Sequence, residues 1–258
     1  MPLLDYGWTL RVQGQLAAAA ICLDAAVRLA METGQRSLAS IAYFQLAVTA
    51  RMQGDLERSQ ELNEQSMALN RQGDTTAELV SLWPRIASAF QSLHAGRLDE
   101  ADRRLRRVVD FLDTSDAFRN HRNSANIGLG LVALGRNEIA LARELLQEAL
   151  ADPVNLYPYT HVQGLIGLAE IAAREGRMGD SSRLLRQALR FAGQRSLIEE
   201  YAEAVLEIAR LQPLHAPIQL LLQETLEHLQ AAGMAHLERQ LEDALENARL
   251  TDLEDQPI

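Results

Sequence analysis

The sequence predicts an all-α solenoid of about six helical hairpins, and three observations lead to this prediction. Strong helix formers dominate the 258-residue chain, of which 47% is hydrophobic and only 5% aromatic. No stretch of six or more residues alternates apolar and polar side chains as a half-buried strand would. Glycine recurs in a similar context roughly every 40 residues, which is typical of a repeat array.

The recurring glycines define the repeat. They are Gly14, Gly54, Gly96, Gly135 and Gly176, at spacings of 40, 42, 39 and 41 residues. A second set of breaks falls between them, at Gly34, Gly73, Thr114, Ser115, Pro153, Gly193 and Gly233. Each interval can hold one helix, and glycine commonly ends a helix. Each repeat is therefore predicted to be two helices joined by a tight turn, followed by a longer turn.

Small residues recur at matched positions around these glycines. Seven positions before them lie Gly7, Ala47, Ala89, Gly128 and Ala169, and five positions after them lie Ala19, Ser59, Ala101, Ala140 and Ser181. In the fourth repeat Ala142 and Ala149 fit the downstream pattern better, as if its turn were two residues longer. Small side chains allow two antiparallel helices to approach closely, so the pattern predicts a packing stripe.

This combination of offsets resembles the tetratricopeptide repeat (TPR), clearly over residues 1–195 and more weakly over 196–233, where Pro213 replaces the turn glycine. The resemblance implies one right-handed superhelical solenoid of TPR-like hairpins with a C-terminal capping helix. The hairpins are expected at about 1–34, 35–74, 75–115, 116–154, 155–195 and 196–233, the capping helix at 235–250 and a tail at 251–258. The period exceeds the family's usual length of about 34 residues. Longer repeats of this kind resemble the C-terminal helical-repeat arm of large MalT-like and LuxR-type ATP-dependent bacterial transcriptional regulators.

The resemblance also implies a binding surface. In TPR proteins the first helices of the hairpins line a concave groove that binds peptides or protein segments. The corresponding positions of this chain hold aromatic, basic and amide side chains, namely Trp8, Arg11, Phe44, Arg51, Trp83, Phe90, His94, Arg122, Gln163 and Arg174. Aromatic and arginine side chains are common at binding hot spots. The alternative for Trp83 and Phe90 is that they pack between neighbouring repeats, as aromatic stripes at helical spacing often do.

Other polar and aromatic segments have a structural interpretation beside a functional one. The basic run Arg103, Arg104, Arg106 and Arg107 is expected to be a solvated helix face, and the alternative is a docking patch for an acidic partner. Pro158 is expected at or near a helix start, and the alternative is that Tyr157 or Tyr159 joins the mouth of the groove beside His121. Glu199 and Glu200 are expected to be solvated on a helix surface.

Composition excludes several kinds of chemistry. All 25 basic residues are arginine, so the chain has neither the lysine of a phosphate-binding loop nor a Schiff-base amine. Motifs of zinc proteases, serine hydrolases and dinucleotide-binding folds are missing from the sequence, so no catalytic residue, metal ligand or cofactor is expected. Cys22 is the single cysteine and allows no internal disulfide. The net charge of −10 disfavours direct nucleic-acid binding.

The location and the partners follow from the same features. The sequence shows no secretory signal and no apolar run of 18 residues, so a cytoplasmic chain without membrane contact is expected. The first hypothesis is a protein–protein or peptide interaction module, the sensor or regulatory arm of a bacterial transcriptional regulator, and not an enzyme. The alternative is a self-assembling TPR scaffold without ligand sensing. Only 13 residues precede Gly14, which suggests an uncapped N-terminal edge through which a homodimer would form.

Overall fold

The structure is a computed structural model that describes residues 2–69, 75–112, 118–212 and 216–254. Within these ranges the chain forms thirteen α-helices and one short 3-10 helix, with no strand, which confirms the predicted all-α solenoid. The helices are α1 Pro2–Val12, α2 Leu16–Glu32, α3 Arg36–Met52, α4 Leu56–Leu69, α5 Thr75–His94, α6 Leu98–Leu112, α7 Arg119–Gly135, α8 Ile139–Leu150, α9 Pro158–Arg174, α10 Met178–Gln194, α11 Ile198–Leu211, α12 Ala216–Ala232 and α13 Ala235–Glu254. The short helix η1 spans Pro153–Asn155.

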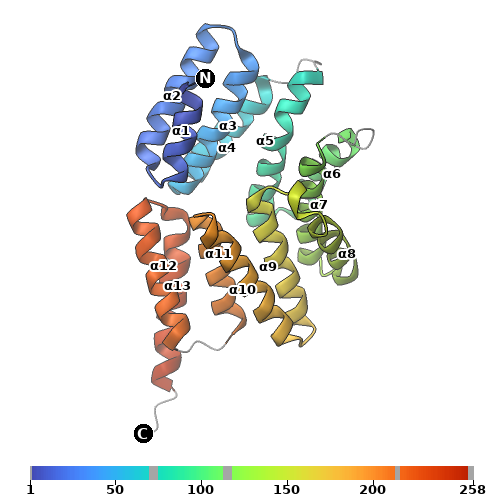
Figure 1. The fold of residues 1–258 in the computed structure, drawn as a ribbon, viewed down its shortest axis with the longest axis vertical. Coiled ribbons are helices and arrows are strands. Elements are labelled where there is room, and N and C mark those ends of the chain that lie inside the picture. The colour runs from blue at the N-terminus through green and yellow to red at the C-terminus, as the bar shows by residue number, and fades with distance from the viewer. Residues whose placement is uncertain (1, 70–74, 113–117, 213–215, 255–258) are drawn as a thin grey trace.

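Consecutive helices pair into hairpins from α1–α2 to α11–α12, and α13 follows as a single helix (Figure 1). The last helix extends to Glu254, beyond the expected end at residue 250, because no glycine or proline interrupts that segment. No helix in the described ranges is both long enough and apolar enough to cross a bilayer.

The tight turns use glycine for its backbone freedom. Gly14, Gly54 and Gly176 have φ angles of 75°, 85° and 75°, a region that side chains with a Cβ rarely adopt. The fourth repeat differs, because Gly135 still belongs to α7 and Asn137 takes the positive φ of 64°. Asparagine tolerates this left-handed conformation better than most residues. The turn of the fourth repeat therefore lies two residues later, as the small-residue pattern predicted.

The predicted packing stripe is buried where helices cross. Ala142 and Ala149 are buried whereas Ala140 is exposed, so the shifted assignment for the fourth repeat is confirmed. A Cβ added to Gly130 would lie 2.8 Å from Cγ of Leu146, which shows how closely α7 and α8 approach. The small side chains thus set the distance between paired helices.

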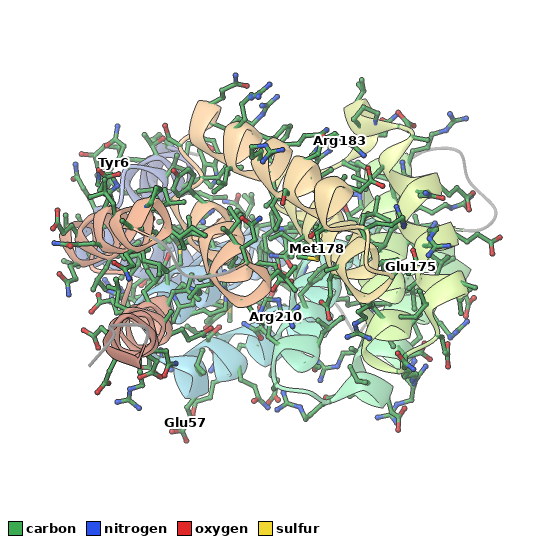
Figure 2. The ribbon with its side chains drawn as sticks, turned by 90° about the horizontal axis from the view of Figure 1, so that it is seen from below. Tyr6, Glu57, Glu175, Met178, Arg183 and Arg210 are labelled. Atoms are coloured by element: carbon green, nitrogen blue, oxygen red, sulfur yellow. The ribbon has the colours of Figure 1, made fainter. Side chains whose placement is uncertain are left out.

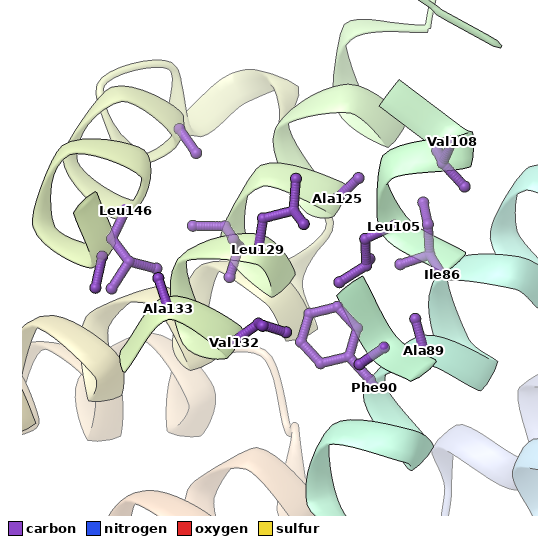
Figure 3. Close-up of a cluster of buried hydrophobic side chains, with 14 of the residues drawn as sticks. Ile86, Ala89, Phe90, Leu105, Val108, Ala125, Leu129, Val132, Ala133 and Leu146 are labelled. Atoms are coloured by element: carbon purple, nitrogen blue, oxygen red, sulfur yellow. The ribbon is translucent and has the colours of Figure 1, made fainter. Parts of the chain in front are cut away.

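The largest apolar cluster lies in the central hairpins, between α5 and α9 (Figure 3). Ile86 and Phe90 of α5 pack there with Leu105 of α6 and Leu129 of α7. Leu146 of α8 extends the same cluster to the next hairpin. Each hairpin therefore buries its apolar face against its neighbours, as expected in a repeat array.

The solenoid curls round until its last hairpin meets its first two (Figure 1). A Cβ added to Gly14 would lie 3.1 Å from Cβ of Ala232, and one added to Gly54 would lie 3.4 Å from Cβ of Ala235. Leu16 and Met52 share one apolar cluster with Met234 and Leu237. We call this contact, between the Gly14 and Gly54 turns with Leu16 and Met52 on one side and residues 232–237 on the other, the seam. It closes the helical hairpins into a ring, which the sequence did not predict.

Candidate functional site

A charged cluster lies on the inner side of the ring, next to the seam. Arg51, in the last turn of α3, donates to both carboxylate oxygens of Glu199 in the first turn of α11, and the Nη2–Oε2 distance is 2.8 Å. The same carboxylate lies 2.8 Å from Nε2 of His236 at the start of α13. Three helices that are far apart in the sequence are therefore joined at one carboxylate.

Arginine and glutamate fix each other's charge at this point. Burial alone would lower the pKa of Arg51, but the attraction of Glu199 outweighs it and raises that pKa above the usual value. Burial alone would raise the pKa of Glu199, but Arg51 and the hydrogen bond from His236 hold it well below its usual range. Both side chains are therefore charged, and each stabilises the other in a place where an unpaired charge would be costly.

Arg11 adds a second positive charge to the cluster. Its Nη2 donates to Oε1 of Gln45 at 3.1 Å, and its Nη1 lies 3.8 Å from Sδ of Met52. Burial lowers the pKa of Arg11, and Glu199 and Arg51 act on it in opposite directions. Its Nε makes no hydrogen bond to the described part of the chain. Arg11 is thus held by neutral partners and keeps hydrogen-bonding capacity.

Two more glutamates of α11, Glu200 and Glu203, lie close to Glu199 in this cluster. Glu199 and Glu200 are only 5% and 9% exposed, so the expectation that they are solvated was wrong. Burial and the charge of Glu199 raise the pKa of Glu200 to about 7. Burial and the same neighbouring carboxylates raise the pKa of Glu203 well above its usual value, and Gln163 donates a hydrogen bond to it. The expectation failed because ring closure covers this face of α11, and closure leaves no local pattern in the sequence.

An aromatic row continues the inner surface away from the seam. The Trp83 ring centroid lies 4.1 Å from that of Tyr157 and 6.3 Å from that of Phe44. The Tyr157 hydroxyl is 3.3 Å from Nε2 of His121, so Tyr157 does lie beside His121. Pro158 is the first residue of α9 and Tyr157 its N-cap, so the expected helix start is confirmed, whereas a role of Tyr157 at the mouth of a groove stays a prediction.

Phe90 and His94 lie on either side of Tyr159. Phe90 is buried in the core with its ring centroid 5.2 Å from that of Tyr159, so its packing role is confirmed. The Tyr159 hydroxyl is 3.5 Å from Nε2 of His94. The His94 side chain is open to solvent, yet burial by surrounding protein lowers its pKa, and Arg51 lowers it further. His94 is therefore a polar side chain at the edge of the aromatic row and close to the charge of Arg51.

The structure does not bring every predicted groove residue together. Trp8 is 50% exposed and has no ring contact among the described residues. Arg122 donates to the carbonyl of Leu112 at the end of α6. Arg174 donates to Glu170, with its Nε 3.1 Å from the Oε1 atom, in the same helix. The predicted residues that converge on the inner surface are Arg11, Arg51, Trp83, His94 and Gln163, whereas Phe44 and Phe90 are buried.

Two arginines of the basic run on α6 pair with carboxylates of the same helix, and Arg104 also donates to Ser88 of α5. Arg104 donates to Glu100 at 2.6 Å and Arg106 to Asp102 at 2.9 Å, both four residues earlier. Exposed pairs of this spacing stabilise a helix modestly. These contacts agree with the solvated-face interpretation. No group of three or more side chains suited to a metal ion occurs among the described residues.

Sequence reasoning missed Glu199, Glu203 and His236. The first two could have been found by carrying the groove positions into the sixth hairpin, because residues four apart lie on one helix face and Glu203 bonds to Gln163. His236 has no such signal, because it reaches the cluster only through closure of the ring.

Comparison with known proteins identifies the fold. No model of a protein family and no curated protein matches the sequence. The Rap conjugation gene regulator of plasmid pLS20, solved in complex with the Phr* peptide, superposes with a TM-score of 0.70 at 14% identity, covering 98% of this chain and 73% of that one. A Rap protein complexed with Competence and Sporulation Factor gives 0.60 at 14% identity, covering 98% and 76%. A Podospora anserina putative kinesin light chain variant with nearly identical TPR-like repeats gives 0.53 at 19%, covering 74% and 93%.

These matches establish a TPR-like helical-repeat fold for this chain. Their identities are too low to carry more than the fold. The resemblance to MalT-like regulators is not shown by them.

Proposed function

We propose that this chain binds a peptide or an extended protein segment inside its ring. The observation that carries the proposal is the convergence of charged, amide and aromatic side chains from α3, α5, α9, α11 and α13 on the inner surface. A purely structural core would be apolar, because buried charge is costly to maintain. The two Rap structures of similar fold are complexes with Phr* and with Competence and Sporulation Factor, which supports a peptide as the ligand class.

The interior offers groups of several kinds to a peptide. Arg11 carries a positive charge beside the cluster, and Tyr159 and His94 present polar atoms 3.5 Å apart. Trp83 and Tyr157 offer aromatic surface beside them. Polar groups of this kind fix the orientation of a ligand, and aromatic surface supplies contact area. The proposal is binding without chemistry, in keeping with a sequence that carries no catalytic motif.

The finer proposal is that binding regulates a larger system, as the sensor arm of a bacterial transcriptional regulator would. It is supported by the long repeat period of roughly 40 residues. A ligand that prefers one conformation of the solenoid would shift the population toward it and so transmit its presence.

Capture from a random heptapeptide pool tests the proposed function. Purified protein is incubated with the pool, retained peptides are identified by mass spectrometry, and the strongest is resynthesised and titrated. Replacing His94 by alanine is expected to weaken binding of this peptide about tenfold, because a polar contact between the imidazole and the peptide is lost. The control is His228→Ala, at an exposed position on α12, which should bind like the wild type. If both variants bind the peptide with the same affinity, the ligand does not contact His94, and the proposed site in the interior is contradicted.

A self-assembling scaffold is the second candidate, and one observation favours it. Large apolar side chains are exposed on the first hairpin, where Tyr6, Trp8 and Ile21 are each about half exposed or more. Tyr6 lies at the outer rim of the molecule (Figure 2). Light scattering across a concentration series separates the candidates. A mass that stays near 28.6 kDa counts against the scaffold, and a doubled mass supports it.

A further inference from the structure

The seam is the place where the ring can open. We propose that the seam opens and closes reversibly, that the Arg51–Glu199–His236 cluster holds it shut, and that opening gives a peptide access to the interior. The claim that opening gives a peptide access rests on the proposed function, whereas the claim that the seam opens and closes does not. The cluster is thereby a conformational device that controls access to the site.

The seam is thinner than any other junction between hairpins. Neighbouring hairpins pack along the length of their helices, whereas the seam joins only turns and helix ends. At the Gly54 turn, an added Cβ would lie 3.4 Å from Cβ of Ala235, while an added Cβ on Gly34 or Gly176 would meet nothing within 4 Å. Local opening occurs where few contacts must be broken. The ring is therefore expected to part at the seam before any hairpin separates from its neighbour.

The polar content of the seam suits repeated opening. Its strongest polar link is the pair of hydrogen bonds from Arg51 to Glu199, and His236, on the same side of the seam as Glu199, contacts that carboxylate and helps to position it. When the seam opens, water replaces the protein partners of these charged groups and solvates them well. The seam also has an apolar part, because Leu16 and Met52 share one buried cluster with Met234 and Leu237. Opening exposes these side chains to water at a cost, and closing restores both their burial and the paired charges.

The same residues connect the seam to the ligand site. Arg51 and Glu199 lie next to the seam and are part of the proposed ligand site, and Glu203 links the cluster to Gln163 further inside. A ligand that contacts Arg51 or Glu199 has different affinities for the closed and open rings, because these groups are paired in one and free to pair with the ligand in the other. Ligand binding and seam opening are therefore coupled.

An engineered disulfide measures seam closure without any ligand. In a Cys22→Ala background, Gly54→Cys and Ala235→Cys place thiols across the seam, where the Cβ separation of 3.4 Å is close to the roughly 3.5–4.5 Å typical of disulfides. The strain of a Cβ at the positive φ of Gly54 is the same in every variant compared, so it does not affect the comparison. The rate of disulfide formation in a glutathione buffer reports the closed population, because the two thiols meet only in the closed ring. Adding Glu199→Gln, which removes the charge and keeps the shape, is expected to lower the rate of disulfide formation at least about threefold.

The matched control is Glu175→Gln. Glu175 accepts hydrogen bonds from Arg143 of α8 and Arg177, and it lies across the molecule from Tyr6 of the first hairpin (Figure 2). Its substitution also removes an ion pair between helices, here a more exposed one, and should leave disulfide formation unchanged. If Glu199→Gln and Glu175→Gln oxidise at the same rate, the cluster does not hold the seam shut and the proposal is overturned.

Hydrogen exchange provides a second readout that needs no new cysteine. In the full chain, Glu199→Gln is expected to speed amide exchange at the end of α3 and the starts of α11 and α13, with no change in α7 and α8. Uniformly faster exchange would show a loss of global stability, and unchanged exchange would show no opening. Either result contradicts the proposal.

Dye-labelled heptapeptides captured from the random pool test the link to the ligand. Uptake by the oxidised Gly54→Cys/Ala235→Cys protein is expected to be at least about tenfold slower than uptake after reduction. Equal rates in both forms would overturn the claim that the seam controls access. Binding by neither form would contradict the proposed function and the access claim with it, while the disulfide and exchange measurements still decide whether the seam opens.

Discussion

Replacing Phe90 by alanine is expected to lower the free energy of unfolding by about 3 kcal/mol, because truncation of a buried aromatic ring leaves a cavity. The Phe90 side chain is 2% exposed and lies among α5, α6 and α7, where a Cβ added to Gly128 would be 3.3 Å from its Cε2 atom. It also packs edge-on against Tyr159, so its loss removes support from the inner surface. The measurement is urea unfolding followed by circular dichroism.

Phe118→Ala is the control for this prediction. Phe118 is 40% exposed and has a φ of 70°, and alanine in its place carries the same backbone strain as phenylalanine. Its substitution should therefore cost less than about 1 kcal/mol. Equal losses at the two positions would show that Phe90 is not part of the core, and would favour its assignment as a groove residue.

Raising the pH from about 5.5 to about 8.5 is expected to remove about 2 kcal/mol of stability that Glu200 contributes. Burial beside Glu199 raises the folded-state pKa of Glu200 to about 7, from an ordinary value of 4.5. A raised folded pKa means that the folded protein binds the proton more tightly than the unfolded chain. The contribution is therefore fully present below pH 4.5 and is lost as the pH rises through 7.

Glu200→Gln isolates this contribution, because glutamine resembles the neutral acid at every pH. The variant should gain about 2 kcal/mol relative to the wild type between the two pH values. Arg11, Arg51, Glu199 and Glu203 surround Glu200 and are the same in both proteins. Glu224→Gln, at an exposed position on α12, should differ from the wild type equally at both pH values. A constant difference for Glu200→Gln would mean that Glu200 is ionised in the folded protein throughout.

Local patterns predicted the hairpins because the physics that forms them is local. A turn residue with positive φ and a small residue where helices cross both leave marks within one repeat, so even the shift from Ala140 to Ala142 could be predicted. The alternative roles of Phe90 could also be stated in advance. Only the structure decided between them, since the same helical spacing serves a core and a groove.

Closure of the ring could not be predicted in this way. It depends on small rotations between successive repeats, which add up over six hairpins until Gly14 meets Ala232. The burial of Glu199 and Glu200 follows from these accumulated rotations. The amphipathic pattern of α11 alone suggests instead that both side chains are exposed to solvent. Only part of the candidate site could therefore be predicted from the sequence. Arg51 was recognised, whereas Glu199, which it contacts, and His236, which contacts Glu199, were missed.

Tryptophan fluorescence tests most directly whether the ligand binds inside the ring. The chain has two tryptophans, with Trp8 exposed on the first hairpin and Trp83 on the inner surface beside Tyr157. Trp8→Phe leaves only Trp83 to report, and Trp83→Phe leaves only Trp8. Titration with the strongest heptapeptide from the pool is predicted to change the emission of Trp83 and to leave that of Trp8 unchanged. A change at Trp8 alone would place the ligand at the exposed surface of the first hairpin and contradict a binding site beside Trp83 in the interior.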